Sequence, residues 1–424
     1  MTAAGTELPA WAPRQAALLL GILQQVVQAV QQGQAADRAL RAAMGDQQKF
    51  GSRDRRLLGD AIFAWFRWHG ALQEQPMARA LCVAWYLDAK PWPPALQAIL
   101  QDLSLPCPEP LADSLSLAER KTAAEAAFDL TLPEVSTWLP VWAAEELAHL
   151  EGYHPLMDFF RRPPAWIRVD QAARPALHEA LVADRAVWAG PLTPCAYAFT
   201  DNGKVHQWLQ QHPDSIEVQD VASQQVVRAC APAAGQSWWD ACCGAGGKSL
   251  QLLDESGREL DLTCTDRRED VLKELSRRGR RHGLARTRRY ALDLLKEPQL
   301  PNIPMDGILL DAPCSGQGTW RRNPDAPWRT AAKDVRQIAR RQLRMLETVV
   351  PALKPGGTLV YAVCSLTRSE TFDVVSQFLE AQPGFELSPF PHPLTGELTD
   401  GRLALLPEAF NSDGMFIARF RQKS

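Results

Sequence analysis

The sequence predicts an α/β protein in which a mostly parallel β-sheet, with helices on both faces, follows a helical N-terminal region. Three observations lead to this prediction. From about residue 235 onward, short apolar runs alternate with helical stretches, which is the rhythm of βαβ units. Residues 1–150 instead repeat apolar side chains at helical spacing. Residues 151–232 mix strand-like and helix-like segments, and predict a small α/β subdomain.

The N-terminal region is expected to be all-α with a core of its own. Apolar residues between Leu19 and Val30 recur with a helical period, and a second helix is predicted to begin near Ser52, which suits an N-cap. Seven of the 14 tryptophans lie within residues 1–150, so aromatic rings are available to fill that core. Six prolines between Pro91 and Pro110 predict a long loop or a kinked connection.

The remaining elements follow in order along the chain. Residues 165–169 alternate like a strand, and residues 173–184 indicate a helix. The next segment looks irregular until residues 218–226, which indicate the entry to another helix. Five predicted strands then lie at residues 237–241, 260–265, 289–292, 307–310 and 358–363. Because helical stretches separate these strands, we expect them to pair in parallel.

Composition excludes several classes of protein. Hydrophobic residues make up 46% of the chain, charged residues 22%, and the net charge is -3, which is typical of globular proteins rather than disordered or fibrous ones. The nine cysteines include no C-x-x-C pair, so we predict neither a zinc ribbon nor a disulfide framework, and no metal. No apolar run approaches the roughly 18 to 20 residues that cross a bilayer, and the N-terminus lacks a signal-peptide pattern. We therefore expect a cytoplasmic protein with no membrane partner.

A glycine-rich loop follows the first predicted strand of the sheet, at Asp240-Ala-Cys-Cys-Gly-Ala-Gly-Gly-Lys-Ser249. Small residues there let a ligand approach the backbone, and the following helix N-terminus favours negative charge. The glycines fit the dinucleotide pattern G-x-G-x-x-G poorly. Gly247-Lys-Ser249 matches the end of a P-loop, but Cys242 stands where its first glycine belongs. An S-adenosylmethionine site and a structural turn without a ligand are the other interpretations.

Acidic residues at the next strand ends favour a nucleoside. Asp266 ends the second strand about 20 residues past the loop, where a carboxylate accepts hydrogen bonds from both ribose hydroxyls. This suits NAD or S-adenosylmethionine rather than a P-loop NTPase. Asp293 follows the third strand, where it would face an adenine amine or cap a helix. Because residues 308–311 resemble a Walker B strand, an ATPase remains the alternative.

Two cysteines follow neighbouring strands at the edge where open α/β sheets bind ligands. Cys314 lies three residues after Asp311, and Cys364 follows the fifth strand. An accessible thiolate attacks electron-poor carbons such as cytosine C6, which turns C5 into a nucleophile for a sulfonium methyl group. A carboxyl group beside cytosine N3 and N4 would stabilise the charge on the ring. The competing interpretation is that each cysteine is a small buried hydrophobe.

Five further cysteines are expected to be small buried hydrophobes, because none lies in a recognisable loop. These are Cys82, Cys107, Cys195, Cys230 and Cys264.

Two clusters of basic residues indicate contact with phosphates. Residues 267–289 carry ten Lys and Arg against three acidic residues. The second cluster contains Arg321, Arg322, Arg329, Lys333, Arg336, Arg340, Arg341 and Arg344. Local excess positive charge neutralises phosphates, and the interleaved Trp320 and Trp328 would stack on unpaired bases. A solvated helix face is the alternative for either cluster.

The motifs together resemble the Sun/Fmu-type RNA cytosine-5 methyltransferases, over residues 155–424. The resemblance starts from Asp311-Ala-Pro-Cys-Ser-Gly-Gln-Gly-Thr319 followed by Arg322-Asn-Pro-Asp325 and Trp328. Four further motifs agree in order and spacing, namely Val218-Gln-Asp-Val-Ala-Ser223, Gly246-Gly-Lys248, Tyr361-Ala-Val-Cys-Ser365 and Asp413-Gly-Met-Phe416. Ser52, Asp54, Arg55 and the pair Arg67-Trp68 also resemble the NusB-like helical domain of family members that modify small-subunit ribosomal RNA.

The resemblance implies a role for each catalytic candidate. Cys364 would be the nucleophile on C6, Cys314 would help to release the product, and Asp311 would hold the cytosine edge. The cofactor would be S-adenosyl-L-methionine. Its binding residues would be Cys242, Cys243, Gly244, Ala245, Gly246, Gly247, Lys248, Asp266, Asp293 and Asp311. The sequence departs from the family at Ala245, where a proline is usual, and at Val363, where a threonine is usual.

The resemblance also implies a domain order and a partner. We expect a helical NusB-like RNA-binding domain at 1–150, a small RRM-like α/β subdomain at 151–232, and at 233–424 a Rossmann-like class I methyltransferase domain. Its seven-stranded sheet would include a reversed last strand at residues 415–420. The expected partner of this monomer is RNA, most specifically small-subunit rRNA. Alternatives are a tRNA or large-subunit rRNA substrate, and an RNA-binding protein without catalysis.

Overall fold

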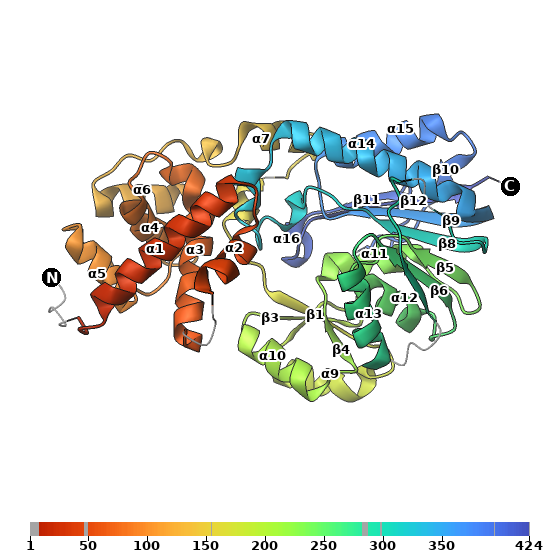
Figure 1. The fold of residues 1–424 in the computed structure, drawn as a ribbon, viewed down its shortest axis with the longest axis horizontal. Coiled ribbons are helices and arrows are strands. Elements are labelled where there is room, and N and C mark those ends of the chain that lie inside the picture. Colours follow the sequence, from red (N-terminus) through yellow and green to blue (C-terminus); the bar gives the residue numbers. More distant parts are fainter. Residues whose placement is uncertain are drawn as a thin grey trace. The chain divides into compact units, whose positions relative to one another are not determined.

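The computed structural model describes residues 8–45, 50–153, 155–281, 287–296, 299–393 and 395–423 (Figure 1). The chain divides into two compact units. The first comprises Met1–Arg162 together with Trp320–Ala331, and the second comprises Pro163–Thr319 with Ala332–Ser424. A short segment from the middle of the predicted methyltransferase region therefore belongs to the helical unit.

The first unit is built from helices. They are α1 (Ala12–Gln31), α2 (Ala36–Met44), α3 (Ser52–Leu72), α4 (Met77–Leu87), α5 (Pro94–Asp102), α6 (Leu117–Phe128), α7 (Val141–Leu147) and α8 (Pro155–Phe159), with the 3-10 turns η2 (Val135–Thr137) and η4 (Ala326–Arg329). The predicted start near Ser52 is confirmed, but Gly51 occupies the N-cap and Asp54 accepts its N–H. The proline-rich segment contains α5 rather than loop throughout, because Pro94 lies in the first turn, where a missing N–H costs nothing.

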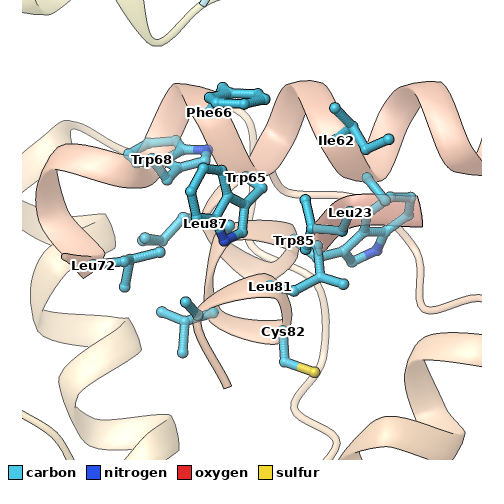
Figure 2. Close-up of a cluster of buried hydrophobic side chains, with 14 of the residues drawn as sticks. Leu23, Ile62, Trp65, Phe66, Trp68, Leu72, Leu81, Cys82, Trp85 and Leu87 are labelled. Atoms are coloured by element: carbon cyan, nitrogen blue, oxygen red, sulfur yellow. The ribbon is translucent and has the colours of Figure 1, made fainter. Parts of the chain in front are cut away.

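Aromatic side chains fill the core of the helical unit. Figure 2 shows Trp65, Phe66 and Trp68 of α3 beside Trp85 of α4. All four side chains are buried. Since each large ring removes 150–250 Å² of apolar surface from water in a typical core, this cluster supplies the unit with its own driving force for folding.

The segment Trp320–Ala331 is an integral part of this helical core. The Asp325 carboxylate accepts the backbone N–H of Ala36 at 3.1 Å and the Arg329 Nε at 2.8 Å. Trp328 donates its indole N–H to the carbonyl oxygen of Phe66 at 2.9 Å. Trp320 is buried. The prediction that these two indoles stack on bases is therefore wrong, because the helical unit already holds them.

The second unit begins with a small antiparallel sheet. Its strands are β1 (Ala165–Val169), β2 (Val187–Trp188), β3 (Ala196–Phe199) and β4 (Ile216–Val218), in the order β2-β3-β1-β4, with helices α9 (Arg174–Ala183) and α10 (Asn202–Gln211). The predicted strand β1 and helix α9 are confirmed. The segment predicted to be irregular instead holds β2, β3, α10 and β4. These strands have two to four residues, and β3 is buried throughout, so neither length nor alternation marked them.

The main sheet of the second unit has the order β10-β12-β9-β8-β5-β6-β7, with β11 paired to β12. Its strands are β5 (Ser237–Asp240), β6 (Asp261–Asp266), β7 (Arg288–Ala291), β8 (Met305–Asp311), β9 (Leu353–Val363), β10 (Phe385–Leu387), β11 (Arg402–Leu405) and β12 (Met415–Gln422). The five predicted strands β5 to β9 are confirmed and pair in parallel. The predicted reversed strand is β12, antiparallel to β9. The sheet has eight strands rather than the predicted seven, because β11 also pairs with β12, in antiparallel orientation.

Helices cover both faces of this sheet (Figure 1). They are α11 (Val221–Cys230), α12 (Gly247–Glu255), α13 (Glu269–Arg281), α14 (Ala332–Val349), α15 (Phe372–Ala381) and α16 (Pro407–Phe410), with η3 (Gln317–Thr319), η5 (Val350–Ala352) and η6 (Arg368–Glu370). Consecutive residues of β5 show the two layers. Trp238 packs into the core of α11, α12 and α13, whereas Trp239 packs into that of α14 and α15.

Gly70 of α3 provides a test of how the segment Trp320–Ala331 packs. A Cβ at Gly70 would lie 2.0 Å from the carbonyl oxygen of Trp138 and 2.8 Å from the Trp328 ring, whereas a Cβ at Gly59 of the same helix meets nothing within 4 Å. We expect Gly70→Ala to lower the free energy of unfolding by about 1–3 kcal/mol through overpacking. Gly59→Ala should raise it by about 0.5–1 kcal/mol through helix propensity.

Thermal unfolding followed by circular dichroism compares the two variants with the parent chain. Equal melting temperatures for Gly70→Ala and Gly59→Ala would show that neither Trp138 nor Trp328 packs closely against α3 at Gly70.

Candidate active site

The carboxyl ends of β5, β6, β8 and β9 meet at one edge of the sheet, as parallel pairing requires. The loop after β5 closes through a hydrogen bond from Gly246 N to Cys243 O at 2.9 Å. Gly246 has φ +86°, and a Cβ there would lie 2.1 Å from Leu275. The positive φ favours glycine here, and a larger residue would also have to move the Leu275 side chain. The turn is thus closed even though position 245 is alanine here and proline in the family that the sequence resembles.

A cavity of about 480 Å³ opens beside this loop. Its walls include most of the predicted cofactor residues, namely Cys242, Cys243, Gly244, Ala245, Asp266, Asp293 and Asp311, together with Cys314 and Cys364. A second cavity of about 350 Å³ is lined by Gly247 and Lys248, and it shares Cys242, Cys243, Asp311 and Cys364 with the first. The structure thus brings the predicted residues together around two adjoining spaces, except that Gly246 shapes the turn and lines neither.

Asp266 and Asp293 are both held in place by backbone N–H groups. The Asp266 carboxylate accepts Gly244 N at 3.1 Å and Arg268 N at 2.9 Å, and its side chain is largely buried. Asp293 accepts Leu295 N at 3.1 Å, so it caps a turn and also lines the larger cavity. The Arg268 side chain also donates to both oxygens of Asp266, at 3.1 and 3.4 Å, so a ligand donor at Asp266 has to share or replace this guanidinium. A carboxylate has about four lone-pair directions, which leaves Asp293 able to accept a further hydrogen bond from a ligand.

Lys248 pairs with Asp311 across the smaller cavity. Its Nζ donates to Asp311 Oδ2 at 2.7 Å. Burial opposes the charge on this lysine, but the charge and the hydrogen bond of Asp311 outweigh burial and raise the pKa of Lys248. A cationic donor therefore holds the carboxylate that the sequence assigned to the cytosine edge.

The thiols of Cys314 and Cys364 lie 3.1 Å apart, sulfur to sulfur. Both side chains are partly exposed. The hydrogen bond to Cys364, burial and the charge of Glu370 raise the pKa of Cys314 well above its usual value. Cys314 is thus kept as a thiol, and either sulfur can donate the hydrogen bond that joins the pair. The loop after Cys314 also contacts the other cysteine, because Gly318 N donates to Cys364 O at 3.0 Å.

The other cysteines follow the predicted pattern only in part. Cys82, Cys230 and Cys264 are buried as predicted. Cys107 is exposed and Cys195 is partly exposed, so burial was wrongly predicted for these two. Cys107 lies in a polar connection after α5 rather than in a helix, which explains its exposure.

The first basic cluster is divided between the cavity and the surface. Arg267 and Arg268 line the larger cavity. Arg278 pairs with Glu217 of the small sheet at 2.6 Å, and Arg288 pairs with Asp261 at 2.7 Å. Arg286 and the side chains of Arg280 and Arg281 lie outside the described residues.

The second basic cluster is divided between the two units. Arg321, Arg322 and Arg329 belong to the helical unit, whereas Lys333, Arg336, Arg340, Arg341 and Arg344 lie on α14 of the second unit. Arg321 is buried and donates to the carbonyl oxygen of Arg161 at 3.0 Å. The cluster in the sequence is therefore shared between two units, and Arg321 is held inside the helical one.

Glu370 is a residue at this site that the sequence motifs did not single out. It lies six residues after Cys364, is fully buried, and accepts hydrogen bonds from Ser315 and Ser365, the neighbours of the two cysteines. A buried loop acid close to a cysteine looks like any other acid in a sequence. The one available signal was its short distance from Cys364 along the chain.

Metal and membrane features are absent from the described part of the chain. Within it, no group of three or more His, Cys, Asp or Glu side chains is arranged to hold a metal ion. None of its helices is both long enough and apolar enough to cross a membrane.

Comparison with protein families gives a match that lies mostly in the second unit. The family model described as 16S rRNA methyltransferase RsmB/F matches residues 227–421. Ribosomal RNA small subunit methyltransferase B of Salmonella arizonae is 32% identical over 295 residues, which are 67% of this chain and 66% of that protein. The aligned part of the chain thus spans about two thirds of this relative.

Solved structures agree with this at the level of the fold. The crystal structure of PH0851 has a TM-score of 0.69 at 21% identity, and the match covers 95% of this chain and 99% of that one. A methyltransferase homologue from Pyrococcus horikoshii has a TM-score of 0.57 at 24% identity, covering 66% of this chain and 94% of its own. The predicted α/β Rossmann-like methyltransferase fold is confirmed.

Asp240, at the end of β5, gives the site a pH-dependent stability. Its side chain is buried, Ser249 donates to its Oδ2 at 2.6 Å, and its Oδ1 has no hydrogen-bond partner among the described residues. Burial raises the pKa of Asp240 to about 7. Between about pH 4 and pH 7 the folded chain therefore keeps a proton that the unfolded chain has lost. Stability must fall as pH rises through this window, and the loss is complete above the folded pKa.

We expect this carboxyl to contribute a slope of up to about -1.4 kcal/mol per pH unit to the free energy of unfolding. Asp240→Asn should remove that slope, since asparagine does not titrate. Urea unfolding at pH 5, 6, 7 and 8 measures it, with Asp214→Asn, an exposed acid of the same unit, as the control. A slope in Asp240→Asn that equals the slope in Asp214→Asn would contradict the assignment.

Proposed function

We propose, from the premise that the chain belongs through residues 227–421 to the family of 16S rRNA methyltransferases RsmB/F, that it forms 5-methylcytidine in small-subunit ribosomal RNA. The observation that carries the proposal is the pair of thiols, Cys314 and Cys364, 3.1 Å apart beside the carboxylate of Asp311. A thiol pair next to an acid suits attack on a pyrimidine ring followed by elimination. The ATPase alternative has no comparable support, because Lys248 is engaged by Asp311 and Ser249 by Asp240.

The cavity of about 480 Å³ fits S-adenosyl-L-methionine as the methyl donor. Asp266 would accept the ribose hydroxyls, Asp293 would face the adenine amine, and the backbone from Cys242 to Gly247 would approach the ligand closely. The positive φ of Gly244 and Gly246 builds this cradle. When bound, this cofactor supplies an electrophilic methyl group attached to a sulfonium.

The residues of the chain divide the remaining chemistry among them. Cys364, after losing its proton, forms a bond from its thiolate sulfur to cytosine C6, which makes C5 nucleophilic. Asp311, held by Lys248, contacts the N3 and N4 edge and stabilises the charge that develops on the ring. After C5 carries the methyl group, a base must remove the C5 proton so that the C6–sulfur bond can break. Cys314 assists the breaking of this bond, because its raised pKa keeps it a thiol that can hydrogen-bond the departing sulfur of Cys364, 3.1 Å away.

The substrate and the two accessory parts of the chain belong to the same proposal. The helical unit would bind RNA through surfaces such as the exposed Arg53, Arg55 and Arg56 at the start of α3. The small sheet would act as an RRM-like subdomain, and the protein would work as a cytoplasmic monomer. A tRNA or large-subunit rRNA substrate is the competing proposal. The target cytosine must leave its stack to reach the thiols.

Replacing each cysteine in turn tests the division of labour. Cys364→Ala should abolish turnover, because no bond to C6 can form. Cys314→Ala should still transfer the methyl group but accumulate a covalent adduct between protein and RNA, because elimination fails. Denaturing gel electrophoresis with labelled RNA detects the adduct.

Cys107→Ala is the matched control, since this thiol is exposed in the helical unit, outside both cavities. It should behave like the parent chain. A Cys314→Ala protein that turns over normally without forming an adduct would contradict the roles given to the two cysteines.

A further inference from the structure

Glu370 connects the two cysteine loops through one buried carboxylate. Its Oε1 accepts Ser315 N at 2.8 Å and Gln342 Nε2 at 3.0 Å. Its Oε2 accepts the hydroxyls of Ser315, Ser365 and Thr367 at 2.5, 2.7 and 2.9 Å. Ser315 follows Cys314, and Ser365 follows Cys364. One side chain thus fixes the residues next to both thiols.

The surroundings of this carboxylate are unusual for a buried acid. Glu370 is fully buried, and no Lys or Arg of the described residues forms an ion pair with it. Its hydrogen-bond donors are neutral. A buried acid without a cation is costly to place, and five donors offset that cost only if all are held in position.

Gln342 of α14 extends this network to the sheet. Its Nε2 also donates to Pro313 O at 3.0 Å, and its Oε1 accepts the hydroxyl of Tyr361 at 3.0 Å. Pro313 precedes Cys314, and Tyr361 lies three residues before Cys364. Both sides of each cysteine are therefore tied to one network, which has Glu370 at its centre.

We propose that Glu370 is a positioning residue. Its carboxylate ties the Cys314 loop to the Cys364 loop and thereby holds the two thiols within reach of the same nucleobase. The effect of Glu370 on catalysis rests on the proposed function, whereas its positioning of the two loops rests on the hydrogen bonds alone. The negative charge of Glu370 supports it, because that charge helps to raise the pKa of Cys314 and so keeps the proton on this thiol.

Glu370→Asp is the sharpest test, because aspartate keeps the charge but is one methylene shorter and cannot reach both serines. We expect kcat to fall about 100-fold with KM for RNA changed less than about threefold, as misplacement of reacting groups by about 1 Å produces. The rate at which diamide joins Cys314 to Cys364 in a disulfide should fall at least about tenfold. Peptide mass spectrometry measures that rate without cofactor or RNA.

A second variant separates the length of the Glu370 side chain from its charge, and a third serves as the control. Glu370→Gln keeps the length, and the serine and threonine hydroxyls can turn to accept from its amide, so the disulfide should form at nearly the parent rate. Glu380→Asp on α15 is the matched control, because Glu380 is exposed, and it should leave both kcat and disulfide formation unchanged.

If circular dichroism shows that Glu370→Asp has lost its folded structure, Ser315→Ala takes its place. That variant removes one tie, and its disulfide formation should slow as well.

The outcomes distinguish the inference from the function. Parent-level disulfide formation and kcat in Glu370→Asp would overturn the positioning role. Slower disulfide formation in Glu370→Asp, with a parent chain that methylates no RNA, would support the positioning role and refute the proposed function.

Discussion

The parallel pairing of β8 with β9 is the constraint on which the rest of the site depends. Asp311 lies opposite Ala362 in this pair, so the two strands end at nearly the same level. The residues that follow them, Cys314 and Cys364, are 50 positions apart in sequence but 3.1 Å apart in space. The helices that bury both faces hold this pairing, and β12 completes it on the far side of β9. This register places the starts of the two cysteine loops side by side.

Buried charge around this edge is held by hydrogen bonds from neighbouring residues. Lys248 neutralises Asp311, Asp240 keeps a proton until about pH 7, and Glu370 is surrounded by neutral donors. The three acids thus have different surroundings: a cation for Asp311, a single hydroxyl for Asp240, and several neutral donors for Glu370.

Much of the fold followed from local patterns in the sequence, but two features did not. The strands β5, β8 and β9 appeared as apolar runs because they are largely buried, and strands buried on both faces are apolar through most of their length, whereas β7 at the sheet edge is partly exposed. The segment Trp320–Ala331 gave no local sign that it joins the helical unit, because its partners, such as Phe66 and Ala36, lie more than 250 positions away. The short strands of the small sheet were missed for lack of length. At the site, glycine and cysteine motifs identified the loops, whereas Glu370 gained its meaning only from the hydrogen bonds it accepts.

The most direct test of this account is the identity of the methylated nucleoside. The purified chain would be mixed with methyl-labelled S-adenosylmethionine and unmodified small-subunit rRNA, and the RNA would be digested to nucleosides and separated. The account predicts label in 5-methylcytidine, because only attack of a thiol at C6 makes C5 of cytosine reactive. Label in any other nucleoside, or no label from a chain that binds the cofactor and this RNA, would contradict it.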